Sequence, residues 1–199
     1  MEITLESIQD QIPYYLTLEA KENLVKALAK FPQLKDYYIN RYQEEVLQGD
    51  GWTSLEIISF RNGKRKFIKG ILLSNSCDIE PSNNREYAPN ITFSPIIKLN
   101  RYIELLSAAK LDESKIKAKI AAIKEQKVTT LFYLPKGAGL DDDYIARLDE
   151  VYTVPFPSFS EQDNRNKLFT LNQVGFYLFL FKLSVHFCRF HENILREKP

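Results

Sequence analysis

The spacing of apolar residues predicts helices at the start of this 199-residue chain and strands after about residue 50. Residues 3–47 follow a helical period with breaks at Pro13 and Pro32. Within this segment the pattern at residues 34–47 is ambiguous, and we expect a helix there. The Gln-Gly-Asp-Gly-Trp sequence at 48–52 then ends the helical pattern, because glycine breaks regular elements.

After residue 51 the period falls to two, which is typical of strands. Residues 55–60 and 66–74 are predicted to form a hairpin, because the Asn62-Gly63 pair between them supports the positive φ of a tight turn. The remaining predicted elements are a polar loop at 75–90, a strand at 90–97, helices within 98–127, a strand at 128–134, a bent strand at 144–154 and a polar linker at 158–167.

A long C-terminal helix is predicted from residue 171 to residue 198, and apolar side chains cover most of its surface. Its polar, mostly basic residues recur at steps of four and three, which places them in one stripe: Lys182, His186, Arg189, Asn193 and Arg196. We therefore expect this helix to be largely buried, with the basic stripe exposed to solvent.

These elements together predict an α+β protein. Its centre is a small, strongly bent antiparallel barrel at residues 48–157, interrupted by a helical hairpin at 98–127. Residues 1–47 form an N-terminal helical segment, and residues 168–199 form a C-terminal helix packed on the barrel.

Charge and cysteine content exclude some classes of protein. The 27 Lys and Arg residues balance 26 Asp and Glu residues, so contact with nucleic acid or an anionic membrane would need a local patch. Two cysteines do not make a disulfide framework, and the acidic N-terminus lacks the basic and apolar regions of a signal peptide. We expect a soluble, cytoplasmic protein with no membrane contact.

A polar cluster follows the second strand of the predicted hairpin and consists of Ser74, Asn75, Ser76, Cys77 and Asp78. A buried strand that ends in such residues delivers polar side chains to one edge of a sheet, so we expect a binding surface there. Cys77 has two interpretations. It is a nucleophile, or it is a packed thiol in a turn that Ser76 and Asp78 hold by hydrogen bonds to the backbone.

Short strings of the chain resemble the MazF/PemK/Kid group of toxins, which are SH3-type barrels. The resemblance covers residues 49–97 and 128–154 and rests on Gln48-Gly49-Asp50, Ile71-Leu72-Leu73-Ser74-Asn75, Ile91-Thr92-Phe93-Ser94-Pro95-Ile96 and the segment 144–154. It implies an SH3-like barrel and a sequence-specific endoribonuclease that usually acts as a dimer.

In that family an Arg-x-Asp pair near the last strand acts as acid and base, and the matching string here is Arg147-Leu148-Asp149. Cleavage by a ribose 2′-hydroxyl needs a base for its proton and a cation at the phosphate. Residues at i and i+2 of a strand share the face that this mechanism requires. A surface salt bridge is the alternative interpretation. The chain departs from the family where Ile68-Lys69 replaces an Arg-Pro and Ile97 replaces a Thr.

Two basic segments are candidates for a phosphate-binding surface. Lys64 and Arg65, followed by Lys66 and Lys69, lie at the hairpin turn. Residues 110–127 contain six Lys against three acidic residues. A helix that only needs a solvated face has the same composition, so both interpretations stay open.

The sequence predicts no metal site and no other cofactor. His186, Cys188 and His191 are candidate ligands on one helix. His186 and Cys188 point about 200° apart and only Cys188 and His191 share a face, so a metal site on this helix fails geometrically. A divalent cation is one interpretation of Asp141, Asp142 and Asp143 together with Asp149, and a solvated acidic loop is the other.

Two functions are predicted. The first is a binding or accessory component of a prokaryotic toxin–antitoxin or anti-phage defence system. Such a component contacts RNA or a partner protein encoded nearby, through Ser74 to Asp78 and the hairpin residues Lys64 and Arg65. The second is an endoribonuclease that uses Arg147 and Asp149. A homodimer is compatible with both.

Overall fold

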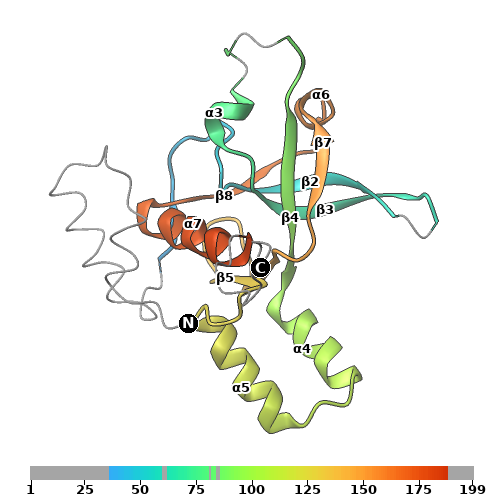
Figure 1. The fold of residues 1–199 in the computed structure, drawn as a ribbon, viewed down its shortest axis with the longest axis vertical. Coiled ribbons are helices and arrows are strands. Elements are labelled where there is room, and N and C mark those ends of the chain that lie inside the picture. Colours follow the sequence, from blue (N-terminus) through green and yellow to red (C-terminus); the bar gives the residue numbers. More distant parts are fainter. Residues whose placement is uncertain (1–35, 60–61, 81, 84–85, 188–199) are drawn as a thin grey trace, which may run out of the picture.

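The computed structural model describes residues 36–59, 62–80, 82–83 and 86–187. The helices predicted before residue 36, and the predicted C-terminal helix beyond residue 187, lie outside these residues. The described chain has an α+β fold, as predicted, in which helices surround one antiparallel sheet bent into a half-barrel (Figure 1).

The sheet has the strand order β1-β8-β2-β3-β4-β6-β5, and β7 also pairs with β4. The strands are β1 (Tyr38–Ile39), β2 (Gly51–Ile58), β3 (Arg65–Leu72), β4 (Asn90–Lys98), β5 (Leu131–Leu134), β6 (Tyr144–Arg147), β7 (Tyr152–Pro155) and β8 (Lys167–Leu171). The helices are α3 (Ser76–Ile79), α4 (Leu99–Ala108), α5 (Glu113–Lys124), α6 (Phe156–Ser160) and α7 (Gln173–Phe187).

Strand β4 lies at the centre of the bend. One of its edges pairs with β3. Along the other edge it pairs first with β7, through Asn90 to Phe93, and then with β6, through Ile96 to Lys98. Gly70 of β3 permits close packing at this point, because a Cβ atom there would lie 2.9 Å from the carbonyl oxygen of Ser94.

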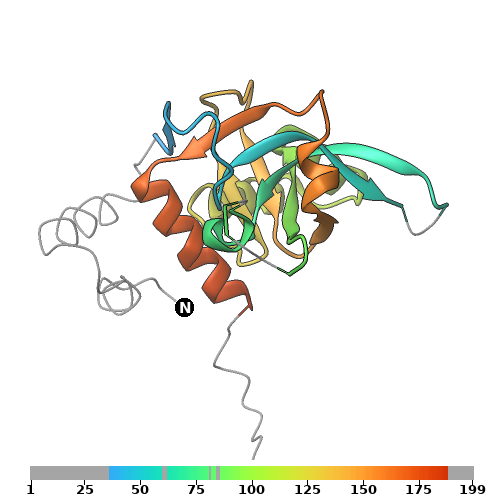
Figure 2. The ribbon, with the colours of Figure 1, turned by 90° about the horizontal axis from the view of Figure 1, so that it is seen from above.

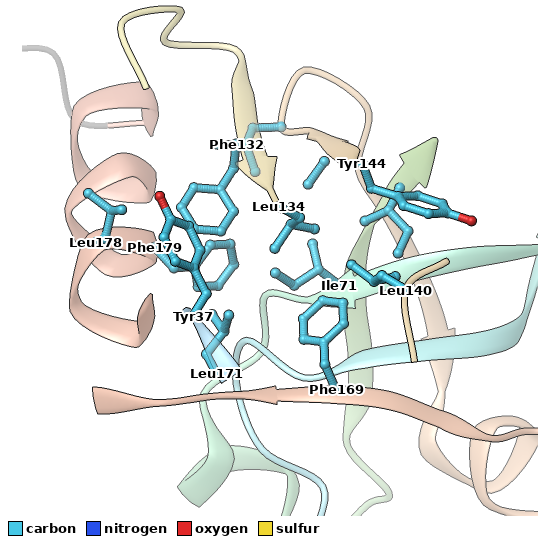
Figure 3. Close-up of a cluster of buried hydrophobic side chains, with 13 residues drawn as sticks. Tyr37, Ile71, Phe132, Leu134, Leu140, Tyr144, Phe169, Leu171, Leu178 and Phe179 are labelled. Carbon is cyan, nitrogen blue, oxygen red and sulfur yellow. The ribbon is translucent and has the colours of Figure 1, made fainter. Parts of the chain in front are cut away.

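The main core lies between the sheet and α7 (Figure 3). The ring of Phe179 on α7 packs against Phe132 of β5, with centroids 5.2 Å apart, and Leu178 is buried beside it. Asn172 begins the helix, because its side-chain oxygen accepts from the N–H of Gly175 at 2.8 Å. Burial of these large side chains, at about 1.5–3 kcal/mol each, holds α7 against the sheet.

Two smaller cores complete the fold. One lies beneath α3 and α6 and includes Trp52, Phe93 and Phe159. The other joins the helical hairpin of α4 and α5 to the sheet, through Leu99 and Ile123. Both helices lie within residues 98–127, and their apolar residues recur at helical spacing.

The predicted helix is wrong for residues 36–47, which contain only the short strand β1. Tertiary contacts fix this strand, because Tyr37 is buried in the main core and the Tyr38 hydroxyl donates to the Pro135 carbonyl oxygen at 2.7 Å. The predicted C-terminal helix is likewise wrong for residues 168–171, which form part of β8 between β1 and β2.

The segment 144–154 is not one bent strand. A turn at residues 148–150 separates β6 from β7, and the two strands pair with different parts of β4. The predicted linker at 158–167 contains the end of α6 and the start of β8.

Lys182 was expected in an exposed stripe of α7, and this expectation is wrong. The residue is only 4% exposed. Gly175 and Phe179 precede it by seven and three residues, so all three lie on one face of the helix, and that face is buried. Its Nζ donates to the carbonyl oxygen of Gln126. Burial lowers the pKa of Lys182 to about 8.

Candidate functional site

The polar cluster after β3 is largely occupied by bonds to the backbone. The Oδ1 of Asn75 accepts from the N–H of Cys77 at 2.9 Å and caps α3. Ser74 Oγ accepts from the N–H of Thr92 at 2.7 Å, and Ser76 Oγ accepts from the N–H of Gln48 at 2.9 Å. These side chains therefore fasten the turn to β4 and to the segment before β2. The side chain of Cys77 is exposed.

Arg147 and Asp149 are in contact at the end of β6. Nη2 of Arg147 lies 3.1 Å from Oδ2 of Asp149, and Nη1 lies 2.7 Å from Oε2 of Glu150. The predicted common sheet face is wrong, because β6 ends at Arg147 and Asp149 lies in the following turn. Partial burial of Arg147 acts to lower its pKa, whereas the negative charges of Asp149 and Glu150 act to raise it. The second effect is larger, so the pKa of Arg147 lies above its ordinary value. The guanidinium is thus already neutralised by two carboxylates.

The acidic residues 141–143 are also paired. Asp141 Oδ2 accepts from Lys98 Nζ at 2.5 Å, and Lys98 together with the hydroxyl of Tyr144 lowers the pKa of Asp141 to about 2. Asp143 Oδ2 accepts from Lys124 Nζ at 2.9 Å. Asp142 accepts from the side-chain amide of Asn100 at 3.1 Å. Within the described residues, no three His, Cys, Asp or Glu side chains are arranged to hold a metal ion.

The basic hairpin residues lie in a projecting arm, which spans residues 55–69 of the sequence and is described at residues 55–59 and 62–69. Both views show this ribbon extending away from the rest of the fold (Figures 1 and 2). β8 pairs with β2 only at Gly51 and Trp52, and β4 pairs with β3 only from Gly70 to Leu72. In the described part of the chain, the two strands of the arm therefore pair with each other alone.

The arm is basic and carries exposed apolar side chains. Its sequence contains five Lys or Arg residues and one acidic residue, Glu56. Phe67 is 63% exposed and Ile58 is 53% exposed. Phe67 lies opposite Glu56 and Ile58 lies opposite Arg65, so all four share one face of the ribbon. Arg65 pairs with Glu56 at 3.0 Å.

The two predicted binding groups are not brought together. Ser74 to Asp78 follow one end of β3, whereas Lys64 and Arg65 lie at the other end. The strand between them has eight residues, which corresponds to about 25 Å.

A second cluster lies where the arm joins the sheet. This root cluster consists of Asp50, Trp52, Phe159, Arg165 and Lys167. The rings of Trp52 and Phe159 meet edge to face with centroids 5.5 Å apart. The guanidinium carbon of Arg165 lies 3.6 Å from the Phe159 centroid and 5.2 Å from that of Trp52. Arg165 therefore lies against both rings.

A β-bulge positions Arg165. The register of β2 against β3 shifts between Trp52 and Leu55, and Ser54 has a φ of 54°. The N–H of Thr53 then donates to the carbonyl oxygen of Asn166 at 2.9 Å. The hydroxyl of Ser54 donates to the carbonyl oxygen of Asn164 at 2.9 Å. The backbone on both sides of Arg165 is thus fastened to β2.

Three hydrogen-bond donors of the root cluster have no partner in the described structure. They are Nε1 of Trp52 and Nε and Nη1 of Arg165, and all three atoms are buried. Within the described residues no carboxylate forms an ion pair with Arg165, and burial lowers its pKa. An unsatisfied buried donor costs about 1–3 kcal/mol. Arg165 is therefore held mainly by stacking.

Sequence reasoning missed the root cluster, because its members come from three separate segments of the chain. Trp52 was assigned to a breaker and Arg165 to a linker. The available signal was the single Trp next to a Gly-Asp-Gly sequence, which gives no indication of what contacts its ring.

No protein-family model matches this sequence, and no curated protein shows significant similarity to it. The resemblance to the MazF/PemK/Kid group therefore stays a prediction. None of the helices in the described part of the chain is both long and apolar enough to cross a membrane.

Proposed function

We propose that this protein is a binding protein that contacts RNA through its hairpin arm. The observation that carries the proposal is a ribbon whose two strands pair only with each other, with five basic residues in its sequence and an exposed Phe67. Lys and Arg side chains neutralise phosphates, and this contact supplies most of the sequence-independent affinity for nucleic acid.

The charge of the arm favours a polyanion over a second copy of the chain. Two such arms pairing edge to edge would place ten basic residues against two acidic ones, and like charges repel. A polyanion is attracted by the same charges and releases its counterions on binding.

The exposed aromatic side chain favours RNA with unpaired bases. Phe67 is more exposed than most apolar side chains that the structure describes, and it lies beside the Arg65–Glu56 pair on one face of the ribbon. Unpaired bases stack on aromatic side chains, which provides about 1–3 kcal/mol per base. Paired bases in a duplex do not offer this face.

The proposal keeps Lys64 and Arg65 as binding residues and gives Ser74 to Asp78 a mainly structural role. A place in a toxin–antitoxin or anti-phage system, a cytoplasmic location, an SH3-like barrel and a partner protein encoded nearby stay predictions. They follow from the family resemblance and from composition.

Salt-dependent binding of labelled RNA tests the proposal. We compare the wild type with the triple variant Lys64→Gln, Arg65→Gln and Lys66→Gln by fluorescence anisotropy. The matched control removes the same charge from α5 by Lys115→Gln, Lys117→Gln and Lys119→Gln. Each lost phosphate contact lowers the slope of log K against log salt by about 0.7 for a single strand, so the arm variant should lose a slope of about 2.

Two outcomes contradict the proposal. In the first, neither protein binds RNA at low salt. In the second, the arm variant and the α5 variant bind equally well, which would place the contact elsewhere.

The second candidate function is an endoribonuclease. It is favoured by the direct contact between Arg147 and Asp149, whose side chains are 38% and 43% exposed. Incubation with labelled RNA in EDTA separates the two functions. Cleavage by the wild type that is lost in Asp149→Asn supports the nuclease, whereas intact RNA at high protein concentration supports binding alone.

A further inference from the structure

The root cluster contains two buried aromatic rings, and the Arg165 side chain lies against both. Trp52 is 7% exposed and Phe159 is 3% exposed. The two rings lie at the base of the arm, because Trp52 precedes the first residue of the arm by only three positions in β2. RNA that follows the arm would therefore pass close to them.

We propose that the Trp52–Phe159 ring pair is a binding site for one unstacked nucleobase of the RNA, and that Arg165 occupies this site in the free protein. The inference rests on the proposed function. On binding, the Arg165 side chain moves off the rings and the base takes its place.

Arg165 is suited to such displacement. Its Nε and Nη1 atoms have no acceptor, and no carboxylate among the described residues holds it. Once the side chain has moved off the rings into solvent, water supplies the missing acceptors. The backbone need not move, because Asn164 and Asn166 on either side stay bonded to Ser54 and Thr53.

The chemistry of the site fits a nucleobase. A base presents a planar face, as the guanidinium does, and aromatic rings bind such faces by stacking. Carbonyl oxygens and ring nitrogens of a base also accept hydrogen bonds. Nε1 of Trp52 has no acceptor in the free protein, and such an atom could supply one. The arginine of a partner peptide would also stack, but its charge would be repelled by the basic arm and by Lys167, whose Nζ lies 5.2 Å from the Trp52 ring centroid.

The single tryptophan of the chain makes the site observable. We titrate the full-length protein with a short single-stranded RNA and record Trp52 emission together with the affinity. Phe159→Leu keeps the apolar volume and removes the stacking face. The matched control is Phe156→Leu, which changes a ring of the same core whose centroid lies 6.1 Å from that of Phe159. Thermal melting checks that both variants fold.

We expect Trp52 emission to change when RNA binds to the wild type. Phe159→Leu should weaken binding about tenfold, and Phe156→Leu should weaken it less than twofold. Arg165→Ala separates displacement from an ordinary phosphate contact. If Arg165 blocks the site, this variant binds RNA as tightly as the wild type or more tightly. If Arg165 only contacts phosphate, the Arg165→Ala variant binds RNA more weakly, and its slope of log K against log salt decreases by about 0.7.

Unchanged Trp52 emission during RNA binding, equal affinities of the two Phe variants, or weaker binding by Arg165→Ala would each overturn the inference. Saturation of Trp52 emission by an arginine-rich peptide but not by RNA would do so as well. If RNA binding is still weakened by the Lys64, Arg65 and Lys66 substitutions in these cases, the proposed function remains intact. Absence of any RNA binding instead removes the proposed function, and the nucleobase site with it.

Discussion

Lys167 and Asp50 form a buried ion pair in which Nζ lies 2.8 Å from Oδ2. The same ammonium group donates to the carbonyl oxygens of Tyr42 at 2.5 Å and Glu45 at 2.6 Å. Asp50 also accepts from the N–H of Leu47 at 2.9 Å. Lys167 thereby fastens the irregular segment before β2 to the start of β8.

Replacement of Lys167 by Met should therefore destabilise the protein by about 3–5 kcal/mol. The Asp50 carboxylate would remain buried without its cation, and burial already raises its pKa in spite of Lys167. Urea denaturation measures the change. Lys66→Met, at an exposed position of the arm, should change the free energy of unfolding by less than about 0.5 kcal/mol. A loss below about 1 kcal/mol in Lys167→Met would show that the pair does not hold this segment.

Gly175→Ala should also destabilise the protein, although alanine favours helices by about 1 kcal/mol relative to glycine. A Cβ atom at this position would lie 2.7 Å from the carbonyl oxygen of Tyr37. That carbonyl cannot move freely, because it accepts from the N–H of Asn172 at 2.7 Å and Tyr37 is buried. We expect a net loss of about 1–3 kcal/mol in urea denaturation.

Gln173→Ala, at an exposed position of the same helix, is the control and should be nearly neutral. If Gly175→Ala were as stable as the wild type, α7 would have room to move away from the backbone of Tyr37.

Asn75→Ala should reduce stability by about 1 kcal/mol and leave the affinity for RNA unchanged. The side chain of Asn75 caps α3 through the N–H of Cys77, and the neighbouring Ser76 accepts from the backbone of Gln48. Denaturation and anisotropy on the same samples separate the two effects. A loss of RNA affinity with unchanged stability would return this polar cluster to the binding surface that the sequence predicts.

The strands β2, β3 and β4 were predictable, because each is long enough for its apolar residues to show a period of two. β1 has two residues and β8 has five, and neither length gives a periodic signal. Long-range contacts position β1: the hydroxyl of Tyr38 reaches Pro135 across 97 positions of sequence. Pattern reasoning over a short window cannot detect such a contact.

The candidate site was predictable only where it depends on composition. The Lys and Arg residues of the arm stand out in the sequence, and the Asn-Gly turn places them in a hairpin. That the arm stands free depends on how far β4 and β8 extend along it, which only the folded chain determines. The stacking of Arg165 on Phe159 likewise depends on a bulge at Ser54 that no local sequence signal marks.

Lys182 shows the limit of assigning faces from polarity. A polar residue on an apolar helix is normally expected at the surface, but here Gly175 sets the buried face by its close contact with Tyr37, the residue before β1. The aliphatic part of Lys182 is buried on that face, and its ammonium group reaches the carbonyl oxygen of Gln126.

The burial of Lys182 predicts a specific dependence of stability on pH. Its pKa is about 8 in the folded protein and about 10.4 in the unfolded chain. Below pH 8 both states are protonated, and the folded state carries the full cost of the buried charge. Between about pH 8 and pH 10.4 the folded state releases its proton first, so the unfolded state binds more protons and stability rises with pH. The gain is on the order of 3 kcal/mol.

Lys182→Met should lack this gain. We expect the free energy of unfolding of the wild type, relative to Lys182→Met, to rise by about 3 kcal/mol between pH 7 and pH 10.4 in urea denaturation. Tyr37 should not contribute over most of this range, because burial raises its pKa to about 12. Lys117→Met, at an exposed position of α5, should follow the wild type at every pH. Parallel pH profiles for the wild type and Lys182→Met would mean that water reaches the Lys182 ammonium group, and that α7 is packed less tightly than the contact with Gln126 implies.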